Sequence, residues 1–336
     1  MSMAIGCWVT PACLEAGSGQ QGLARTEALD ELAQVLRDRF GRRLRRGELL
    51  ARHTTLGVGG PADLWVTVNT PSELADAVGL AWRRSMPCLV LGCGANLLVS
   101  DKGVRGLVIH NRCRQVRLEE GDPPRLLVES GVLLTSLVRR LADWGLGGLE
   151  WAVGIPGTLG GAVVNNAGAY GHCMADSLVR AQVVLPGAEP IWQGVEWFEY
   201  AYRSSRLKQE HPDAAGGVVL QAELALSRRP RTELAGRLAE YAAWRRASQP
   251  SGASAGSMFK NPGGDYAGRL IEAAGLRGTR VGNAQISPLH ANFFINLGHA
   301  RAADFMALIE RARQGVKAQF GVDLELEIQL AGEWDE

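Results

Sequence analysis

Apolar residues recur at helical spacing in several stretches of the chain. Leu29, Leu32, Val35 and Leu36 fall on one face of a helix, which the pattern predicts from about Ala24 to Phe40. Thr70 precedes a proline at the first position of another predicted helix, which ends near Arg84. The same periodicity and its stop signals predict four further helices: Leu133–Trp144 before Gly145, Thr232 to about Ala247, Tyr266–Ala274 and Ala302–Phe320.

Short apolar runs between these segments are typical of strands. They predict strands at Cys88–Leu91, Leu107–His110, Leu126–Glu129, Val179–Leu185, Val218–Leu226, Ala291–Asn296 and Leu324–Leu330. Two stretches rich in Gly, Ser or Gln are predicted to be irregular, namely residues 1–22 as a frayed end and Ser248–Ser257 as a loop. The alternation of strands and helices over residues 51–228 predicts a mixed α/β or α+β domain.

The segment Ser227–Arg231 is polar and basic and contains Pro230, which favours a domain boundary. We therefore divide the chain into an N-terminal extension with one helix (1–50), a larger domain (51–228) and a smaller α+β domain (229–336). No internal repeat is visible in the sequence.

Composition narrows the possible partners. Among 336 residues, 36 Lys and Arg balance 35 Asp and Glu, so the net charge of +1 gives no overall attraction to nucleic acid or anionic lipid. A local cluster of arginines at positions 37–46 has no interleaved aromatic residues, and it is interpreted as a solvated helix end. We predict that the protein binds no nucleic acid.

The number of cysteines and the hydropathy of the chain indicate the cellular compartment of the protein. Six cysteines without a C-x-x-C pair predict small core residues in a reducing, cytoplasmic environment. The uncharged segment Trp151–Tyr170 resembles a membrane span in length, but it contains Pro156, the pair Asn165-Asn166 and several glycines. We therefore predict a folded loop system and no membrane segment.

Several common catalytic motifs are missing from the sequence. There is no G-x-x-x-x-G-K-[ST] phosphate loop and no H-E-x-x-H, and the six histidines are scattered, so no metal site is predicted. Gly92 to Leu97 lacks the third glycine of a Rossmann dinucleotide motif. Gly252 to Gly256 matches the serine-hydrolase G-x-S-x-G, but Pro250 precedes it and Pro262 follows it, where a strand and a helix are needed.

Two glycine-rich loops in the larger domain remain as candidate chemistry. With 42 glycines, one residue in eight, the chain can bring its backbone close to a large ligand. Backbone N–H groups in such loops can form concave anion sites, so the two loops together favour a phosphate-bearing cofactor. The candidate cofactor-binding residues are Gly92, Cys93, Gly94, Ala95, Asn96, Leu97, Gly154, Ile155, Pro156, Gly157, Gly160, Gly161, Asn165 and Gly168.

Seven stretches in a fixed order resemble the UDP-N-acetylenolpyruvoylglucosamine reductase family. They span about residues 51–332: HTTLGVGGPAD (53–63), LGCGANLLVSDKGVRGLVI (91–109), GLEWAVGIPGTLGGAVVNNAGAYG (148–171), YRSSRLK (202–208), SAGSMFKNP (254–262), YAGRLIEAAGLRGTRVGNAQISPLHANFFIN (266–296) and FGVDLELEI (320–328). The short distance from Arg203 to Ser257 resembles the compact subtype, which lacks a tyrosine-bearing insertion over the substrate. Ala95 replaces a serine that the family usually has, so a hydroxyl contact to the cofactor is lost.

The resemblance implies an α+β fold with a two-part FAD-binding domain of the vanillyl-alcohol-oxidase type (PCMH type), followed by a smaller α+β substrate-binding domain. It implies non-covalently bound FAD and NADPH as co-substrate. It also implies reduction of UDP-N-acetylglucosamine enolpyruvate to UDP-N-acetylmuramate for peptidoglycan, in the cytoplasm and as a monomer. The alternative is another FAD-dependent oxidoreductase of the same fold that acts on a sugar or hydroxy acid.

The resemblance also assigns roles to residues. Arg203 matches a residue that stabilises the enolate-like intermediate through its carboxylate, Ser257 matches the proton donor, and Glu327 matches a second stabiliser. Glu325 lies two residues away on the same face of an extended segment and is the alternative to Glu327. The expected contacts of the UDP-sugar are Tyr202, Lys260, Asn261 and His290, with Gln285, Asn292 and Arg245 or Arg246 as weaker candidates.

Overall fold

The computed structural model describes residues 8–9, 19–209 and 216–334, and side chains from residue 25 onward. A five-stranded sheet forms the first lobe, and its inner strands β4, β6 and β3 are parallel. Helices α1 and α2 pack against it and bury Leu32 and Leu36. The elements are β1 (Trp8–Val9), α1 (Gly19–Phe40), β2 (Leu44–Leu49), β3 (Pro61–Val68), α2 (Pro71–Trp82), β4 (Cys88–Leu91) and β6 (Val104–Asn111).

The second lobe is built on an antiparallel sheet in the order β13-β12-β14-β8-β7. Its apolar face packs on helices α3 and α4, and Trp151 and Phe198 are fully buried in that core. The elements are β7 (Val116–Glu119), β8 (Arg125–Glu129), α3 (Leu134–Asp143), α4 (Leu159–Asn165), β12 (Leu178–Val184), β13 (Ile191–Gly194) and β14 (Val218–Ala225). Val184, Val218 and Leu220 also pack into the core of the first lobe, so these two lobes share apolar contacts.

The third lobe is smaller and holds an antiparallel sheet in the order β16-β19-β18-β17. Helices α6 and α7 cover this sheet around Phe294 and Phe305. The elements are β16 (Ala253–Ser257), α6 (Ala267–Ala273), β17 (Arg280–Val281), β18 (Ala284–Ile286), β19 (Phe293–Asn296) and α7 (Ala302–Phe320).

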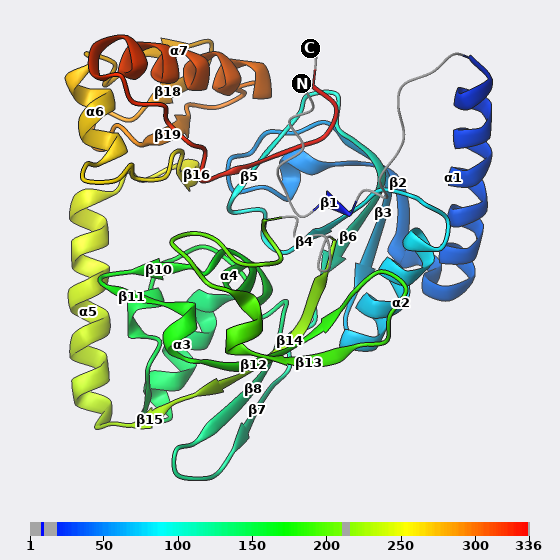
Figure 1. Ribbon diagram of the computed structural model, residues 1–336, viewed down its shortest axis with the longest axis horizontal. Helices are drawn as coiled ribbons and strands as arrows, with labels where there is room; N and C mark the ends of the chain where they lie inside the picture. Colours follow the sequence, from blue (N-terminus) through cyan, green and yellow to red (C-terminus); the bar gives the residue numbers. More distant parts are fainter. Residues whose placement is uncertain (1–7, 10–18, 210–215, 335–336) are drawn as a thin grey trace.

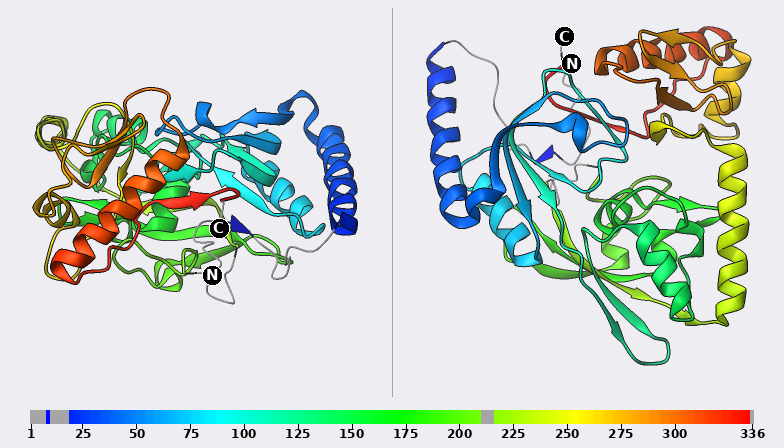
Figure 2. Two further views of the ribbon diagram at one scale, coloured as in Figure 1. Left: turned by 90° about the horizontal axis from the view of Figure 1, so that it is seen from above. Right: turned by 180° about the vertical axis from the view of Figure 1, so that it is seen from behind.

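Two connections join the third lobe to the others. Helix α5 (Arg231–Ser248) runs from the second lobe to the third and contacts α3 on the way (Figure 1). At the other end, the chain after α7 returns to the first lobe, where β20 (Gln329–Ala331) pairs in parallel with β5 (Leu97–Val99). Figure 2 shows this returning segment crossing between the lobes from two further directions. We call residues 324–331 the C-terminal strap.

The remaining elements are short. They are the strand pairs β9 (Leu146–Gly147) with β15 (Ser227–Arg228) and β10 (Gly168–Ala169) with β11 (His172–Cys173), and the 3-10 helices η1 (Gly41–Arg43), η2 (Leu50–Arg52), η3 (Glu150–Ala152), η4 (Met174–Asp176) and η5 (Val195–Phe198).

Most predicted elements are confirmed, some with shifted ends. The Thr70 hydroxyl accepts a hydrogen bond from the N–H of Glu73, as expected of a helix cap. Gly145 ends α3 with a φ of 71°. Helix α7 and strand β4 have the predicted bounds. The first predicted helix begins earlier, at Gly19, and most of the predicted frayed end lies outside the described residues.

Two predictions were wrong. Residues 253–257 are not loop but strand β16, because their backbone pairs with β19 although the side chains are small. The predicted strand Leu324–Leu330 is regular only at β20. Leu324 and Ile328 are buried, but before Gln329 the strap makes a single bridge, between Phe259 and Leu326. The alternating apolar residues of this segment are therefore buried, although before Gln329 the segment has no neighbouring strand to pair with.

The predictions about the cysteines and about the uncharged segment Trp151–Tyr170 can be compared with the structure. Cys88 and Cys113 are buried and Cys93 and Cys173 are half-buried. Cys93, Cys113 and Cys173 are free, whereas Cys7 and Cys13 lie outside the described residues. None of the described helices is long and apolar enough to cross a membrane. The segment Trp151–Tyr170 forms η3, the short helix α4 and connecting turns.

Candidate functional site

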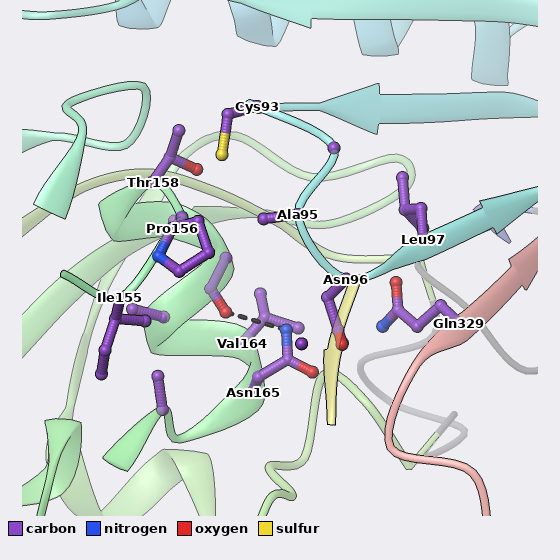
Figure 3. Close-up of a pocket in the computed structure, with 18 of the residues that line it drawn as sticks. Cys93, Ala95, Asn96, Leu97, Ile155, Pro156, Thr158, Val164, Asn165 and Gln329 are labelled. Atoms are coloured by element: carbon purple, nitrogen blue, oxygen red, sulfur yellow. Dashed lines mark hydrogen bonds between the residues drawn. The ribbon is translucent and has the colours of Figure 1, made fainter. Parts of the chain in front are cut away.

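A cavity of about 380 Å³ lies where the three lobes meet. Both predicted glycine loops line it, and so do segments from all three lobes. Figure 3 shows the first loop, with Cys93, Ala95 and Asn96, facing Ile155, Pro156, Thr158 and Asn165 of the second. Its size falls within the range of pockets that hold small molecules and cofactors.

The first loop, residues 92–97, connects β4 to β5 and requires glycine at two positions. A Cβ on Gly94, which has a φ of +62°, would lie 2.3 Å from the carbonyl oxygen of His53. A Cβ on Gly92 would lie 2.5 Å from the Thr158 hydroxyl. The backbone therefore packs against both neighbouring segments at distances that no side chain tolerates.

The pKa of the Cys93 thiol depends on its surroundings in this loop. Burial raises its pKa, while hydrogen bonds from the backbone N–H groups of Cys93 and Ala95 act in the opposite direction. Both N–H groups are thus directed at the Cys93 sulfur, and Cys93 and Ala95 line the cavity. Neighbouring backbone N–H groups that point to one site can also bind an anion.

The second loop surrounds helix α4. The N–H of Gly160 donates to the carbonyl of Ser130, and a Cβ on Gly160 would lie 2.9 Å from that of Ser130. The Asn165 side chain donates from Nδ2 to the carbonyl of Gly161 at 2.9 Å (Figure 3). Its Oδ1 is buried and has no hydrogen-bond partner within the described chain. A buried acceptor beside a cavity calls for a donor on a ligand.

Of the predicted cofactor residues, only Gly154 does not line the cavity. Gly154 has a φ of 70°, and a Cβ there would lie 3.1 Å from Cδ and Nε of Arg245. Its place in the fold is beneath the Arg245 side chain, which itself lines the cavity.

Arg203, Ser257 and Glu327 all line this cavity, although they come from three separate parts of the chain. Arg203 Nε forms an ion pair with Glu327 Oε1 at 2.8 Å, and Arg203 Nη2 donates to the carbonyl of Gly168 at 2.7 Å. Arg203 has a φ of 55°, which is uncommon for a residue other than glycine and concentrates at functional sites. Ser257 lies at the end of β16, and its hydroxyl makes no hydrogen bond to the described residues.

The electrostatics of Glu327 combine two opposing effects. Burial raises its pKa, and the nearby charges of Arg203, Lys208 and Lys260 lower it, with a net rise. Its side chain is 18% exposed and that of Arg203 is 22% exposed. By contrast, the side chain of Glu325, the alternative candidate, is 71% exposed and pairs with Lys260. The geometry therefore distinguishes the two carboxylates.

The predicted substrate contacts do not line the cavity. Tyr202 is 54% exposed and its ring centroid lies 5.5 Å from the Arg203 guanidinium carbon. Lys260 pairs with Glu325, and the Asn261 side chain accepts from the N–H of Ala267. The His290 ring accepts from the N–H of Asn292, and burial lowers its pKa. Their contact with substrate remains a prediction.

The weaker candidates Gln285 and Asn292 serve the backbone. Asn292 is 3% exposed; it donates to the carbonyl of Phe259 and accepts from the Phe259 N–H. Gln285 donates to the carbonyl of Gly278. These bonds give both amides a structural role.

Sequence reasoning missed several residues of the cavity wall. They lie at the ends of strands, directly before α4 or directly after α5: Asn111, Ser130, Thr158, Val218, Val219, Gln249 and Gln329. Ser130 could have been found from the sequence, because it is a polar residue directly after the predicted strand that became β8.

Asn96 has a second task besides lining the cavity. Its side-chain amide donates to the carbonyl of Glu327 at 3.2 Å, and its own carbonyl accepts from the N–H of Gln329. The first glycine loop thus holds the C-terminal strap where its pairing with β5 begins, and with it residue Glu327.

Comparison with known proteins identifies this arrangement. A family model described as the C-terminal domain of UDP-N-acetylenolpyruvoylglucosamine reductase matches residues 247–331, and an FAD binding domain model matches residues 62–193. The reductase of that name from Chloroflexus aggregans is 46% identical over 288 residues, which cover 85% of this chain and 97% of the relative. A second one, from Symbiobacterium thermophilum, is 43% identical over 306 residues, which cover 90% and 96%.

A solved structure agrees with these relatives. The crystal structure of UDP-N-acetylenolpyruvylglucosamine reductase from Thermus caldophilus superposes with a TM-score of 0.74 at 42% identity, covering 86% of this chain and 99% of that one. The chain belongs to the UDP-N-acetylenolpyruvoylglucosamine reductase family.

Membership of the reductase family confirms the predicted fold class, an FAD-binding domain followed by a smaller domain. The residue boundaries we gave to the domains remain a prediction. Within the described ranges, no three His, Cys, Asp or Glu side chains are grouped so that they could hold a metal ion.

The cavity residues fit the FAD of this family. Gly92, Gly94 and Gly160 let the loops pack closely on Thr158, His53 and Ser130 around the cavity. The N–H groups of Cys93 and Ala95 suit a pyrophosphate, and the free Oδ1 of Asn165 suits a ring N–H or a ribityl hydroxyl. These residues would hold FAD even though Ala95 lacks a hydroxyl.

Asn165 provides a test of this assignment. We expect Asn165→Ala to weaken FAD binding about tenfold, because a buried hydrogen bond is worth about 1–1.5 kcal/mol. Fluorescence titration of apoprotein with FAD measures the effect. The control is Asn283→Ala, an exposed asparagine outside the cavity whose side chain makes no described hydrogen bond. Equal FAD affinity of Asn165→Ala and wild type would contradict the assignment.

Proposed function

We propose that the chain is an NADPH-dependent flavoenzyme that reduces UDP-N-acetylglucosamine enolpyruvate to UDP-N-acetylmuramate. The observation that carries this proposal is that Arg203, Ser257 and Glu327 line the same glycine-lined cavity, with Arg203 and Glu327 in an ion pair. The names of the relatives support the substrate class, since they refer to the enolpyruvoyl sugar. NADPH as reductant follows from the resemblance of the sequence to the family.

FAD, when bound, supplies the hydride that the enolpyruvyl group receives. Arg203 then binds the substrate carboxylate, because a guanidinium offers two parallel donors to a carboxylate. As the carboxylate gains enolate character, its negative charge grows, and the same donors bind it more tightly than in the ground state.

Glu327 complements Arg203 in this scheme. Burial raises its pKa and favours the neutral acid. In that form its carboxyl donates a hydrogen bond to the developing oxyanion. In the structure Glu327 is paired with Arg203 instead, so the incoming carboxylate replaces the Glu327 carboxylate as the partner of the guanidinium.

Ser257 delivers the proton to the carbanionic carbon. Its hydroxyl lies on the cavity wall and is not engaged by a described group, so it is free to point at substrate. A lone serine is a weak acid, and its proton is replaced from solvent or from a neighbouring acid after transfer.

Two broader expectations are also part of the proposal. The catalytic residues come from one chain, which supports a monomer as the active unit. The free thiols of Cys93, Cys113 and Cys173 support a reducing compartment such as the cytoplasm. Size-exclusion chromatography with light scattering tests the monomer.

Turnover tests the function itself. We expect the FAD-loaded protein to oxidise NADPH only when the enolpyruvyl sugar nucleotide is present, with UDP-N-acetylmuramate as product. Absorbance at the NADPH band and mass spectrometry of the product measure it. Bound FAD together with turnover of a different sugar or hydroxy acid would favour the alternative oxidoreductase.

Ser257→Ala separates the two half-reactions. We expect reduction of the bound flavin by NADPH to be unchanged and its reoxidation by the sugar nucleotide to slow by about 10²–10⁴-fold, since only the second half-reaction needs the proton. Stopped-flow absorbance measures both rates. Ser254→Ala, on the same strand but outside the cavity wall, is the matched control. Equal slowing of both halves would instead assign Ser257 to the fold or to flavin placement.

The pH profile tests the neutral Glu327. Because only the protonated acid donates, we expect the reoxidation rate to fall as pH rises through the raised pKa of Glu327. Glu327→Gln should remove this limb, because the amide donates at every pH, whereas Glu327→Ala should lower the plateau about a hundredfold, as for loss of one oxyanion donor. Glu325→Gln, two residues away and exposed, should retain the wild-type profile. A profile that Glu325→Gln changes and Glu327→Gln does not would reverse our assignment of the two carboxylates.

A further inference from the structure

Three aromatic rings pack together beside the site, and the proposed chemistry does not use them. Tyr170 stacks on Tyr241 with 4.4 Å between ring centroids and 15° between planes. Trp244 lies 5.6 Å from Tyr170 and 5.8 Å from Tyr241. Trp244 is 51% exposed, so this cluster presents apolar ring surface to solvent. We call these three residues the aromatic platform.

The platform adjoins the cavity through its neighbours in sequence. Tyr170 directly follows Gly168 and Ala169, which line the cavity. On α5, Trp244 and Arg245 follow Tyr241 by three and four positions, so all three lie toward one side of the helix. Arg245 lines the cavity, as does Gln249 directly after the helix, so the platform lies at the rim beside them.

Arg245 supplies the second observation. Burial lowers its pKa, and its described polar partner is the Tyr170 hydroxyl. No carboxylate among the described residues pairs with it. A partly buried guanidinium that faces a cavity without a carboxylate is suited to bind an anion, and a phosphate fits its planar donor geometry.

We propose that the aromatic platform binds the base of a nucleotide, whose diphosphate lies against Arg245. A flat heterocycle stacks on tyrosine and tryptophan rings with little dependence on its identity. A diphosphate next to the ribose brings the negative charge to the guanidinium beside the rings. This inference rests on the proposed function, since it places a nucleotide at the outer end of the same cavity.

Two nucleotides of the proposed reaction share this chemistry. The sugar nucleotide carries uracil and a diphosphate, and NADPH carries two bases joined through a pyrophosphate. The platform is therefore tested with UDP and with NADP⁺ separately, and the nucleotide whose affinity depends on the platform is its occupant.

The test measures dissociation constants of FAD-loaded protein by isothermal titration calorimetry. We expect Trp244→Ala to weaken binding of UDP, NADP⁺ or both by at least about tenfold, and Trp244→Phe to retain most of the affinity. Inorganic pyrophosphate, which has no base, should bind wild type and Trp244→Ala equally. Trp192→Phe is the control, since Trp192 packs against Arg180 on β13, away from the cavity wall.

Three results would overturn the inference: unchanged affinities of Trp244→Ala for both nucleotides, a loss of pyrophosphate binding equal to the loss of nucleotide binding, or no binding of either nucleotide to wild type. The second result would mean that Trp244 merely positions Arg245. Turnover of the enolpyruvyl sugar by Trp244→Ala at saturating substrate separates this outcome from failure of the proposed function, which predicts no turnover in wild type either.

Discussion

The ion pair between Arg203 and Glu327 joins parts of the chain that are otherwise separate. Arg203 belongs to the second lobe, and Glu327 lies on the C-terminal strap, which leaves the third lobe and pairs with β5 of the first. Asn96 secures the strap from the first glycine loop, which also lines the cofactor cavity. The strap therefore brings Glu327 beside Arg203, and the residues that we propose as catalytic line the cavity where the three lobes meet.

The cavity itself depends on backbone rather than on side chains. Gly92, Gly94 and Gly160 lie so close to Thr158, His53 and Ser130 that any Cβ would overlap them. This close packing leaves N–H groups and the Asn165 oxygen as the polar surface toward a cofactor. A site of this kind tolerates the change from serine to Ala95, because the lost hydroxyl is one donor among several and the backbone geometry is unaffected.

Features that follow from hydrophobic periodicity or from the ordered motifs could be predicted from the sequence. It predicted every described α-helix except α4, the strands β4, β6, β8, β12, β14 and β19, and the glycine loops; Arg203, Ser257 and Glu327, which it grouped in one site, all line one cavity. It did not reveal β16, because small residues carry no strand signal and pairing with β19 decides their conformation. It could not reveal how Gly154 supports Arg245 or how Asn292 bonds Phe259, because those contacts depend on tertiary packing between distant segments.

The most direct test of this account is a crystal structure of the FAD-loaded protein with the enolpyruvyl sugar nucleotide bound. The account predicts the substrate carboxylate on the Arg203 guanidinium in place of Glu327, with the Ser257 hydroxyl facing the enolpyruvyl carbon that receives the proton. A complex in which Arg203 keeps Glu327 as its partner while the carboxylate binds elsewhere would contradict it.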